Sequence, residues 1–334
     1  MRRARHWVIT GLSVLLLGAC AEGREPEPTR TERNASSAPP AFGDRFSRTF
    51  AWSDAATGFR RSPATAESLV QGPNAVAVLD ASRILVLDRL AGRVAVVDGS
   101  GAVRTLATVP VDVEDVAAGP GVFVTSSPVR ASAEVFDLEG KSLGVLPVPR
   151  ELRDVTSLAF GADRRVVAKT AYQEQITLGV PAAPVALASA LAGKREGAYL
   201  LPDGRGVRVR AQNGAAVIEV VTQAADEQAR SEVVKSWPIA GAVTAARILG
   251  GAGSSVCLRT ETLADDGVLS VTRRAVCVDV ASGMCSFDEA LPAPGLYVPR
   301  TEVAFGSGRL AWIHPTAEGL AVTSVRIAAT EVAP

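Results

Sequence analysis

Histidine is the side chain that most often supplies a catalytic base or a zinc ligand, and this 334-residue chain has only His6 and His314. A histidine-based zinc site needs several such ligands, and a Ser-His-Asp triad needs a well-placed base. His314 ends an apolar run and stands directly before Pro315. This position favours a structural or solvent-facing histidine, so no catalytic residue is predicted.

Carboxylates are the remaining metal ligands, and they gather in two places. One group is Asp112, Glu114 and Asp115, and the other is Asp265 and Asp266. Oxygen ligands suit Ca²⁺, but neither group has the spacing of an EF-hand loop. Both groups stand where turns are expected, so solvated turn acids are the favoured interpretation, and neither a metal nor another cofactor is predicted.

Two arginines share one face of an expected strand. Arg208 and Arg210 alternate with Val207 and Val209, and side chains two residues apart in a strand point the same way. They are candidates for contact with an anionic ligand or partner. The alternative is pairing with acids of a neighbouring structural unit, because a buried unpaired charge is costly, or plain exposure.

A fourth kind of chemistry lies near the N-terminus. Arg2, Arg3 and Arg5 precede a largely apolar run over residues 7–17, as in a secretory signal. This run is too short to cross a membrane as a helix, which takes about 20 apolar residues. The sequence then reads Leu-Gly-Ala-Cys and ends at Cys20.

These four residues resemble the lipobox of bacterial lipoproteins. The resemblance implies cleavage after residue 19 and a diacylglyceryl thioether on Cys20, usually with a further acyl chain on the new amine. Two or three chains hold a protein firmly to a membrane, where one would not. Ala21 replaces the aspartate that favours inner-membrane retention, so the outer membrane is the favoured address.

The residues after Cys20 predict a tether. Residues 20–41 are polar, contain four prolines and have almost no apolar side chain, so they cannot bury enough surface to order themselves. Loss of residues 1–19 removes three arginines and no acid. The mature chain therefore carries 32 basic and 35 acidic residues, a formal net charge of −3, which excludes the basic footprint of a nucleic-acid binder.

Three cysteines, Cys257, Cys277 and Cys285, remain for the folded part, where export implies an oxidising compartment. Cys277 and Cys285 flank the turn at residues 279–283, so the favoured disulfide joins these two across a hairpin. The alternative joins Cys257 to Cys277 across the turn at residues 265–267. In either case one unpaired thiol remains. The absence of a Cys-x-x-Cys motif indicates that the disulfide is structural and has no redox role.

Short apolar runs rich in valine and isoleucine fill residues 42–334, and turn residues bound each run, which predicts an all-β domain. Residues 189–195 allow at most one helical turn. The runs recur in units of about 40 to 60 residues, each long enough for four strands, as in β-propeller blades. The six unit openings are residues 72–78, 112–117, 154–160, 197–201, 243–248 and 302–305.

Turn chemistry supports this interpretation. Asp98, Asp137 and Asp279 each end an apolar run, and a glycine follows within a few residues. An aspartate that binds its own turn and a glycine at positive φ are typical of hairpins. Six blades fit best, with seven blades or a long β-sandwich as alternatives, and residues 46–52 are expected to pair with the C-terminal strand and close the ring.

Residues 72–98 also resemble a repeat of the NHL or YncE-like propellers. The matching positions include Pro73, Val76 to Val78, Ile84 to Asp88, and Arg93 with Val94. The resemblance covers one repeat well and the others loosely, so it implies the fold and little about function. The six-bladed lactonases and amidating lyases hold metals in the central channel, but their ligand motifs cannot be mapped onto this chain beyond Asn74 and Asn213.

These observations predict a lipid-anchored protein of the cell envelope. Its propeller is expected to act as a non-catalytic protein-binding or scaffolding module with an envelope protein as its partner. The alternative is a metal-dependent hydrolase or lyase of the six-bladed propeller type. The identity of the partner is beyond the reach of the sequence.

Overall fold

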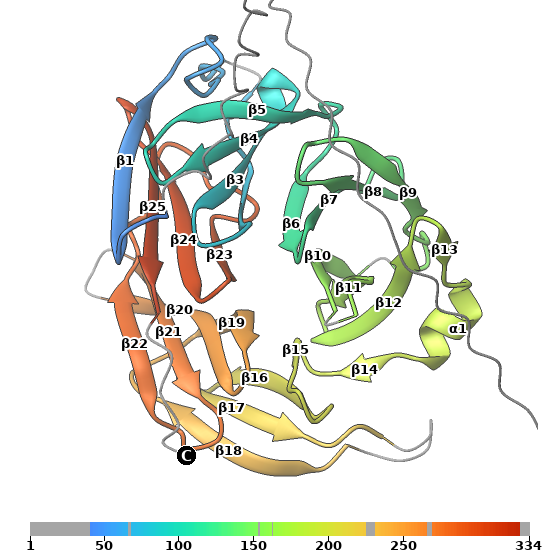
Figure 1. The fold of residues 1–334 in the computed structure, drawn as a ribbon. Coiled ribbons are helices and arrows are strands. Elements are labelled where there is room, and N and C mark those ends of the chain that lie inside the picture. The colour runs from blue at the N-terminus through green and yellow to red at the C-terminus, as the bar shows by residue number, and fades with distance from the viewer. Residues whose placement is uncertain are drawn as a thin grey trace, which may run out of the picture. The chain divides into compact units, whose positions relative to one another are not determined.

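The structure, a computed structural model, describes residues 41–65, 68–152, 154–161, 163–224, 231–265 and 269–327. The predicted signal peptide, Cys20 and all but the last residue of the predicted tether lie outside these ranges. The described residues form a β-propeller of six sheets (Figure 1), as the sequence predicts. None of the helices among them is long and apolar enough to span a membrane.

Each sheet is a meander of antiparallel strands, and the blades follow one another in chain order. Blade 1 contains β2 (Ala75–Val78), β3 (Arg83–Asp88), β4 (Arg93–Asp98) and β5 (Val103–Thr108), with a 3₁₀ turn, η1 (Arg89–Ala91), between β3 and β4. Blade 2 contains β6 (Asp115–Gly119), β7 (Val122–Ser127), β8 (Ser132–Asp137) and β9 (Ser142–Pro147). Blade 3 contains β10 (Val155–Phe160), β11 (Val166–Thr170), β12 (Glu174–Val180), β13 (Ala183–Pro184) and β14 (Arg195–Glu196).

The second half of the ring repeats the pattern. Blade 4 contains β15 (Tyr199–Leu200), β16 (Gly206–Gln212), β17 (Ala215–Val221) and β18 (Val233–Ile239). Blade 5 contains β19 (Ala245–Ala252), β20 (Ser255–Asp265), β21 (Leu269–Asp279) and β22 (Cys285–Ala290). Blade 6 contains β23 (Val303–Gly306), β24 (Arg309–Pro315), β25 (Gly319–Arg326) and, from the other end of the domain, β1 (Arg45–Ala51). A six-residue helix, α1 (Leu187–Ala192), lies near the predicted helical turn.

The six predicted unit openings are the six inner strands, β2, β6, β10, β15, β19 and β23. β1 pairs with β25 from Arg45 opposite Val325 to Ala51 opposite Gly319. This pairing confirms the predicted closure, in which an N-terminal strand completes the last blade. Closure matters because it removes an exposed sheet edge from the ring.

Apolar side chains from facing sheets form the core between blades. Five buried clusters fill the interfaces of blades 1 and 2, 2 and 3, 4 and 5, 5 and 6, and 6 and 1. The alternation of apolar residues in each strand presents one set of side chains to each neighbouring blade.

The interface between blades 3 and 4 is different, because polar side chains join its described residues. The Gln173 amide accepts a hydrogen bond from the Val209 N–H (2.8 Å) and donates one to the Val209 carbonyl. Gln223 makes the same two-sided contact with the backbone of Glu196, at 2.9 and 2.8 Å. Each glutamine thus satisfies one backbone donor and one acceptor that no strand partner covers.

The predicted turn aspartates make the expected bonds. Asp98 Oδ1 accepts from the N–H groups of Ser100 (2.9 Å) and Ala102 (3.1 Å), and Gly101 follows at φ +79°. Asp137 and Asp279 accept in the same way from N–H groups two residues further on. Burial opposes ionisation of Asp98, but these hydrogen bonds outweigh it and hold its pKa below the ordinary aspartate value.

We expect Asp98→Ala to lower the free energy of unfolding by about 1 kcal/mol at neutral pH, because two turn N–H groups lose their acceptor. The measurement is the urea midpoint of each variant. The folded-state pKa is depressed, so the contribution is present above the unfolded pKa of ~3.9 and is lost as the pH falls through the folded value. Asp98→Asn keeps an acceptor and is the control. A deficit that persists undiminished at acid pH would contradict this account.

Candidate functional site

The six inner strands all run in the same direction, so they begin at one face of the ring. The parallel bridge between Ala75 and Thr301 shows this for blades 1 and 6. Because neighbouring strands within a blade are antiparallel, the same face carries the loops between second and third strands and those that lead to the next blade. We call it the entry face.

A cavity of about 250 Å³ occupies the central channel. All six inner strands line it, together with β11. Its charged groups lie at the entry-face ends of these strands, and they are Asp115, Lys169 and Arg247. The lining also includes the hydroxyl side chains of Ser157 and Thr301. The channel is therefore charged at its mouth.

The far end of the channel is aromatic. Phe160, Phe305 and Tyr199 line it there, at or near the ends of inner strands. Phe160 packs directly on Gly119, where any Cβ would overlap its ring. Tyr199 packs on Gly251 in the same way, because a Cβ there would lie 2.8 Å from the ring. Two glycines thus let the rings pack closely on the inner strands of neighbouring blades and line this end of the channel with apolar surface.

The predicted acidic cluster does not come together as one site. Asp112 pairs with Arg130 (2.7 Å) and accepts from Ser127 Oγ (2.7 Å), while Glu114 pairs with Arg300. Among the described residues, no group of three His, Cys, Asp or Glu side chains could hold a metal ion. Of the second group, Asp266 lies outside the described residues.

For Asp115, the predicted interpretation as a solvated turn acid is wrong. It begins β6 and is 3% exposed, and its Oδ1 accepts from Thr301 Oγ1 at 2.8 Å. Burial raises its pKa, although the Thr301 bond and the charges of Arg300 and Arg247 oppose that shift. It therefore belongs to the channel mouth and to no solvated turn.

Arg208 and Arg210 lie on one face of β16, as predicted. Arg208 stands opposite Glu219 of β17, with 2.7 Å between Nε and Oε2, and also pairs with Glu196 of blade 3. Arg210 pairs with the same Glu219. The acids of this blade and its neighbour thus occupy both guanidinium groups, which supports the pairing alternative. A role in anion or partner binding stays a prediction.

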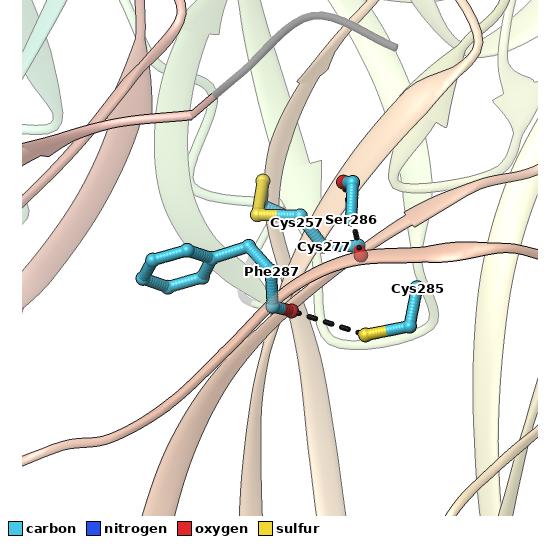
Figure 2. The surroundings of a disulfide bond; sticks show 5 residues. All are labelled: Cys257, Cys277, Cys285, Ser286 and Phe287. Carbon is cyan, nitrogen blue, oxygen red and sulfur yellow. Dashed lines mark hydrogen bonds between the residues drawn. A yellow bond between two sulfur atoms is a disulfide. The ribbon is translucent and has the colours of Figure 1, made fainter.

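The favoured disulfide, Cys277 to Cys285, is wrong. The structure joins Cys257 to Cys277, with a Cα–Cα distance of 4.0 Å, and leaves Cys285 exposed with its Sγ directed at the Phe287 carbonyl (Figure 2). Register explains the pairing. Cys257 of β20 stands directly opposite Cys277 of β21, whereas Cys285 of β22 stands opposite Val278, after a bulge. Adjacent residues of a strand point to opposite faces, so Cys285 cannot face Cys277.

The remaining candidates have structural positions. His314 lies near the end of β24, and burial, with the charge of Arg273, lowers its pKa, so it is neutral at pH 7. The Asn74 amide donates to the Glu114 carbonyl (2.7 Å) and accepts from the Arg300 N–H (3.3 Å), which ties two entry-face loops together. Asn213 is an exposed residue of the β16–β17 turn at φ +54°.

Beside the channel, the entry face carries a second hollow of about 580 Å³. The β7–β8 turn, the loop between blades 2 and 3, and Arg300 line it, with Val129, Val148 and Leu152 among its apolar side chains. Arg300 also pairs with Glu114. The loops that lead into blades 3 and 6 therefore line this hollow, and the Arg300–Glu114 pair joins the second of them to the loop into blade 2.

The same face carries a group of exposed apolar side chains. Among the described residues, large hydrophobic side chains on entry-face loops are exposed to between 42% and 85%. They are Leu69, Val111, Val129, Tyr172, Leu296 and Val298. Scattered exposed hydrophobics are ordinary, but a group of them on one face marks an interaction surface. No sequence pattern marks these residues as a group, because only the topology brings their loops to one face.

No protein-family model matches the sequence, and no curated protein does. Solved structures are similar to this chain at low identity. A streptogramin B lyase structure is 10% identical, with a TM-score of 0.43, over 85% of this chain and 99% of that chain. A putative oxidoreductase (glucose dehydrogenase) from Thermus thermophilus is 14% identical, also at 0.43, over 80% and 99%. Neither likeness carries an argument about activity, and the propeller assignment depends on the six blades themselves.

Proposed function

We propose that this protein is a lipid-anchored module of the cell envelope, held by the lipid on Cys20, whose propeller binds an envelope protein without catalysing a reaction. The observation that carries the proposal is the set of exposed apolar side chains on the entry-face loops, one of which, Val129, lines the 580 Å³ hollow. A partner that covers Val129, Val111 and Val298 would remove their apolar surface from water, which is favourable by ~25 cal/mol per Å².

The surroundings of the hollow suit a protein partner. The hollow combines apolar loop residues with the polar side chains of Ser126 and Arg300, and protein interfaces commonly combine apolar and polar groups. The hydrogen-bonded loops give the face a fixed shape, since Asn74, Glu114 and Arg300 hold one another. The predicted tether of residues 20–41 would let this face reach a partner beyond the lipid surface.

The test is recovery of a partner from cells after mild cross-linking and detergent solubilisation. The full lipidated chain is compared with the double variant Val129→Asp/Val298→Asp, which places two charges on the apolar face. The matched control is Leu143→Asp/Val145→Asp on the outer strand β9, where both side chains are also exposed. We expect one stoichiometric partner with the original chain and the control, and at least a tenfold loss with the double variant.

The anchor is tested in the same preparation with Cys20→Ser. We expect this variant to leave the membrane fraction and to lose incorporation of radiolabelled palmitate. Equal recovery of partner with all variants, or recovery of the chain alone, would refute the docking role. Retention of Cys20→Ser in the membrane fraction would refute the anchor and leave the docking role to be judged on its own result.

A further inference from the structure

Two cations at the mouth of the central channel have no partner in the part of the chain that the structure describes. Lys169 projects from β11 of blade 3, and Arg247 from β19 of blade 5, and both line the 250 Å³ cavity. Other cations near them are paired. Arg300 pairs with Glu114, and Arg259 pairs with Glu261 and Glu302.

The charge at the mouth is unbalanced. Asp115 is the carboxylate that acts on Arg247, but its oxygen is engaged by Thr301 and burial raises its pKa. Burial and the charge of Arg247 lower the pKa of Lys169 to about 8. Burial is the largest cause of both shifts, and the neighbouring arginine lowers the pKa of Lys169 further. An enclosed site with two unpaired cations gains from an added anion.

The cavity also has an apolar end. Phe160 and Phe305 line it below the cations, and Tyr199 completes this end. A guanidinium can bind a carboxylate through two parallel hydrogen bonds, and a lysine ammonium adds a compact charge beside it. The volume of about 250 Å³ admits a small molecule and excludes a folded segment.

We propose that the central channel binds a small carboxylic acid with an apolar body, its carboxylate between Lys169 and Arg247 and its body against Phe160 and Phe305. This site is separate from the docking surface proposed above, since it uses neither Val129 nor Val298. It goes beyond the proposed function by assigning the domain a small-molecule ligand.

The test uses benzoate as the probe and isothermal titration calorimetry on the folded chain. Benzamide has nearly the same shape without the charge, and inorganic phosphate has the charge without the ring. We expect benzoate to bind at one site per chain and at least tenfold more tightly than either comparison. Equal affinity for benzamide would refute the role of the cations, and tighter binding of phosphate would refute the role of the apolar end.

Variants distinguish binding at this site from a general effect of the protein's positive charge. Lys169→Gln and Arg247→Gln are each expected to weaken benzoate at least tenfold. Lys141→Gln is the matched control, because Lys141 lies in the β8–β9 turn at the opposite face, and it should leave the affinity unchanged. Thermal unfolding of each variant checks that the fold is retained. Unchanged affinity in both channel variants would overturn the proposal.

The pH dependence tests the original chain alone, should either variant fail to fold. Between about pH 7 and about pH 9.5 the free lysine loses its proton, so benzoate affinity should fall in this window. The other titratable groups that line the cavity are Arg247, Asp115 and Tyr199, and Arg300 acts on the first two while it pairs with Glu114. The arginines stay charged, and burial raises the pKa of Tyr199 above its ordinary value, beyond this window. Constant affinity across the window would refute the part assigned to Lys169.

Discussion

The double variant Cys257→Ala/Cys277→Ala is expected to lose about 3 kcal/mol of its free energy of unfolding. The two cysteines are separated by 20 residues, and a cross-link of that length restricts the unfolded chain by about this amount. Both side chains are fully buried in the cluster between blades 5 and 6, beside Trp312 and Leu310. Alanine avoids the added cost of a buried hydroxyl. Urea unfolding at neutral pH measures the change.

Two controls distinguish this pairing from the one favoured by the sequence. Reductant should lower the stability of the original chain by a similar amount and leave the double variant unchanged. Cys285→Ala should match the original chain, since Cys285 is exposed and unpaired. Peptide mapping without reductant should recover Cys257 linked to Cys277. Loss of stability in Cys285→Ala, with none in Cys257→Ala, would restore the other pairing.

The sequence left this choice open for a physical reason. Cys277 is flanked by two hairpin turns, and either turn could bring a cysteine across from it. The pairing depends on register, and the bulge between Cys277 and Val278 shifts the register of β21 against β22 by one residue. A shift of one residue reverses the face of every side chain beyond it. Composition and turn chemistry do not predict such a bulge.

The fold was easier to predict than the disulfide, because the patterns that indicate strands and turns are local in the sequence. Alternating apolar runs predict strands, and the aspartate and glycine turns at Asp98, Asp137 and Asp279 predict the hairpins that the structure contains. Recurrence of the unit predicts the blades. Closure by β1 follows from the need to cover the last sheet edge.

Lys169 and Arg247 were not predicted as site residues, because ring closure brings them together from distant blades. Lys169 and Arg247 are 78 positions apart in number and have no shared motif. A signal was present. Asp115 and Arg247 both lie within predicted unit openings and near the start of β6 and β19, and the inner strands run parallel, so alignment of the units would have placed them at one height. Lys169 lies on the second strand of its blade, so its position at the channel mouth can be predicted only from the three-dimensional structure.

The buried position of Glu302 was not predicted either, although this residue begins the sixth predicted unit. It forms ion pairs with Arg259, at 2.8 Å, and with Arg273, both from blade 5, and Arg273 donates a hydrogen bond to it. The side chains of Arg273 and Glu302 are 6% and 8% exposed, and Arg273 also donates to the Pro292 carbonyl at 2.7 Å. This carboxylate therefore joins blades 5 and 6 through a buried ion-pair network.

We expect Glu302→Ala to lower the free energy of unfolding by about 3–5 kcal/mol, because it leaves a buried guanidinium without its counter-charge. Urea unfolding at neutral pH measures the loss, and Glu302→Gln should lose less, since its amide oxygen still accepts. The matched control is Glu289→Ala, which breaks the exposed Arg45–Glu289 pair between β22 and β1 and should cost under about 1 kcal/mol. If the two alanine variants lost equal stability, burial would not explain the contribution of the Glu302 network to the free energy of unfolding. The interface of blades 5 and 6 would then depend on its apolar cluster and its disulfide alone.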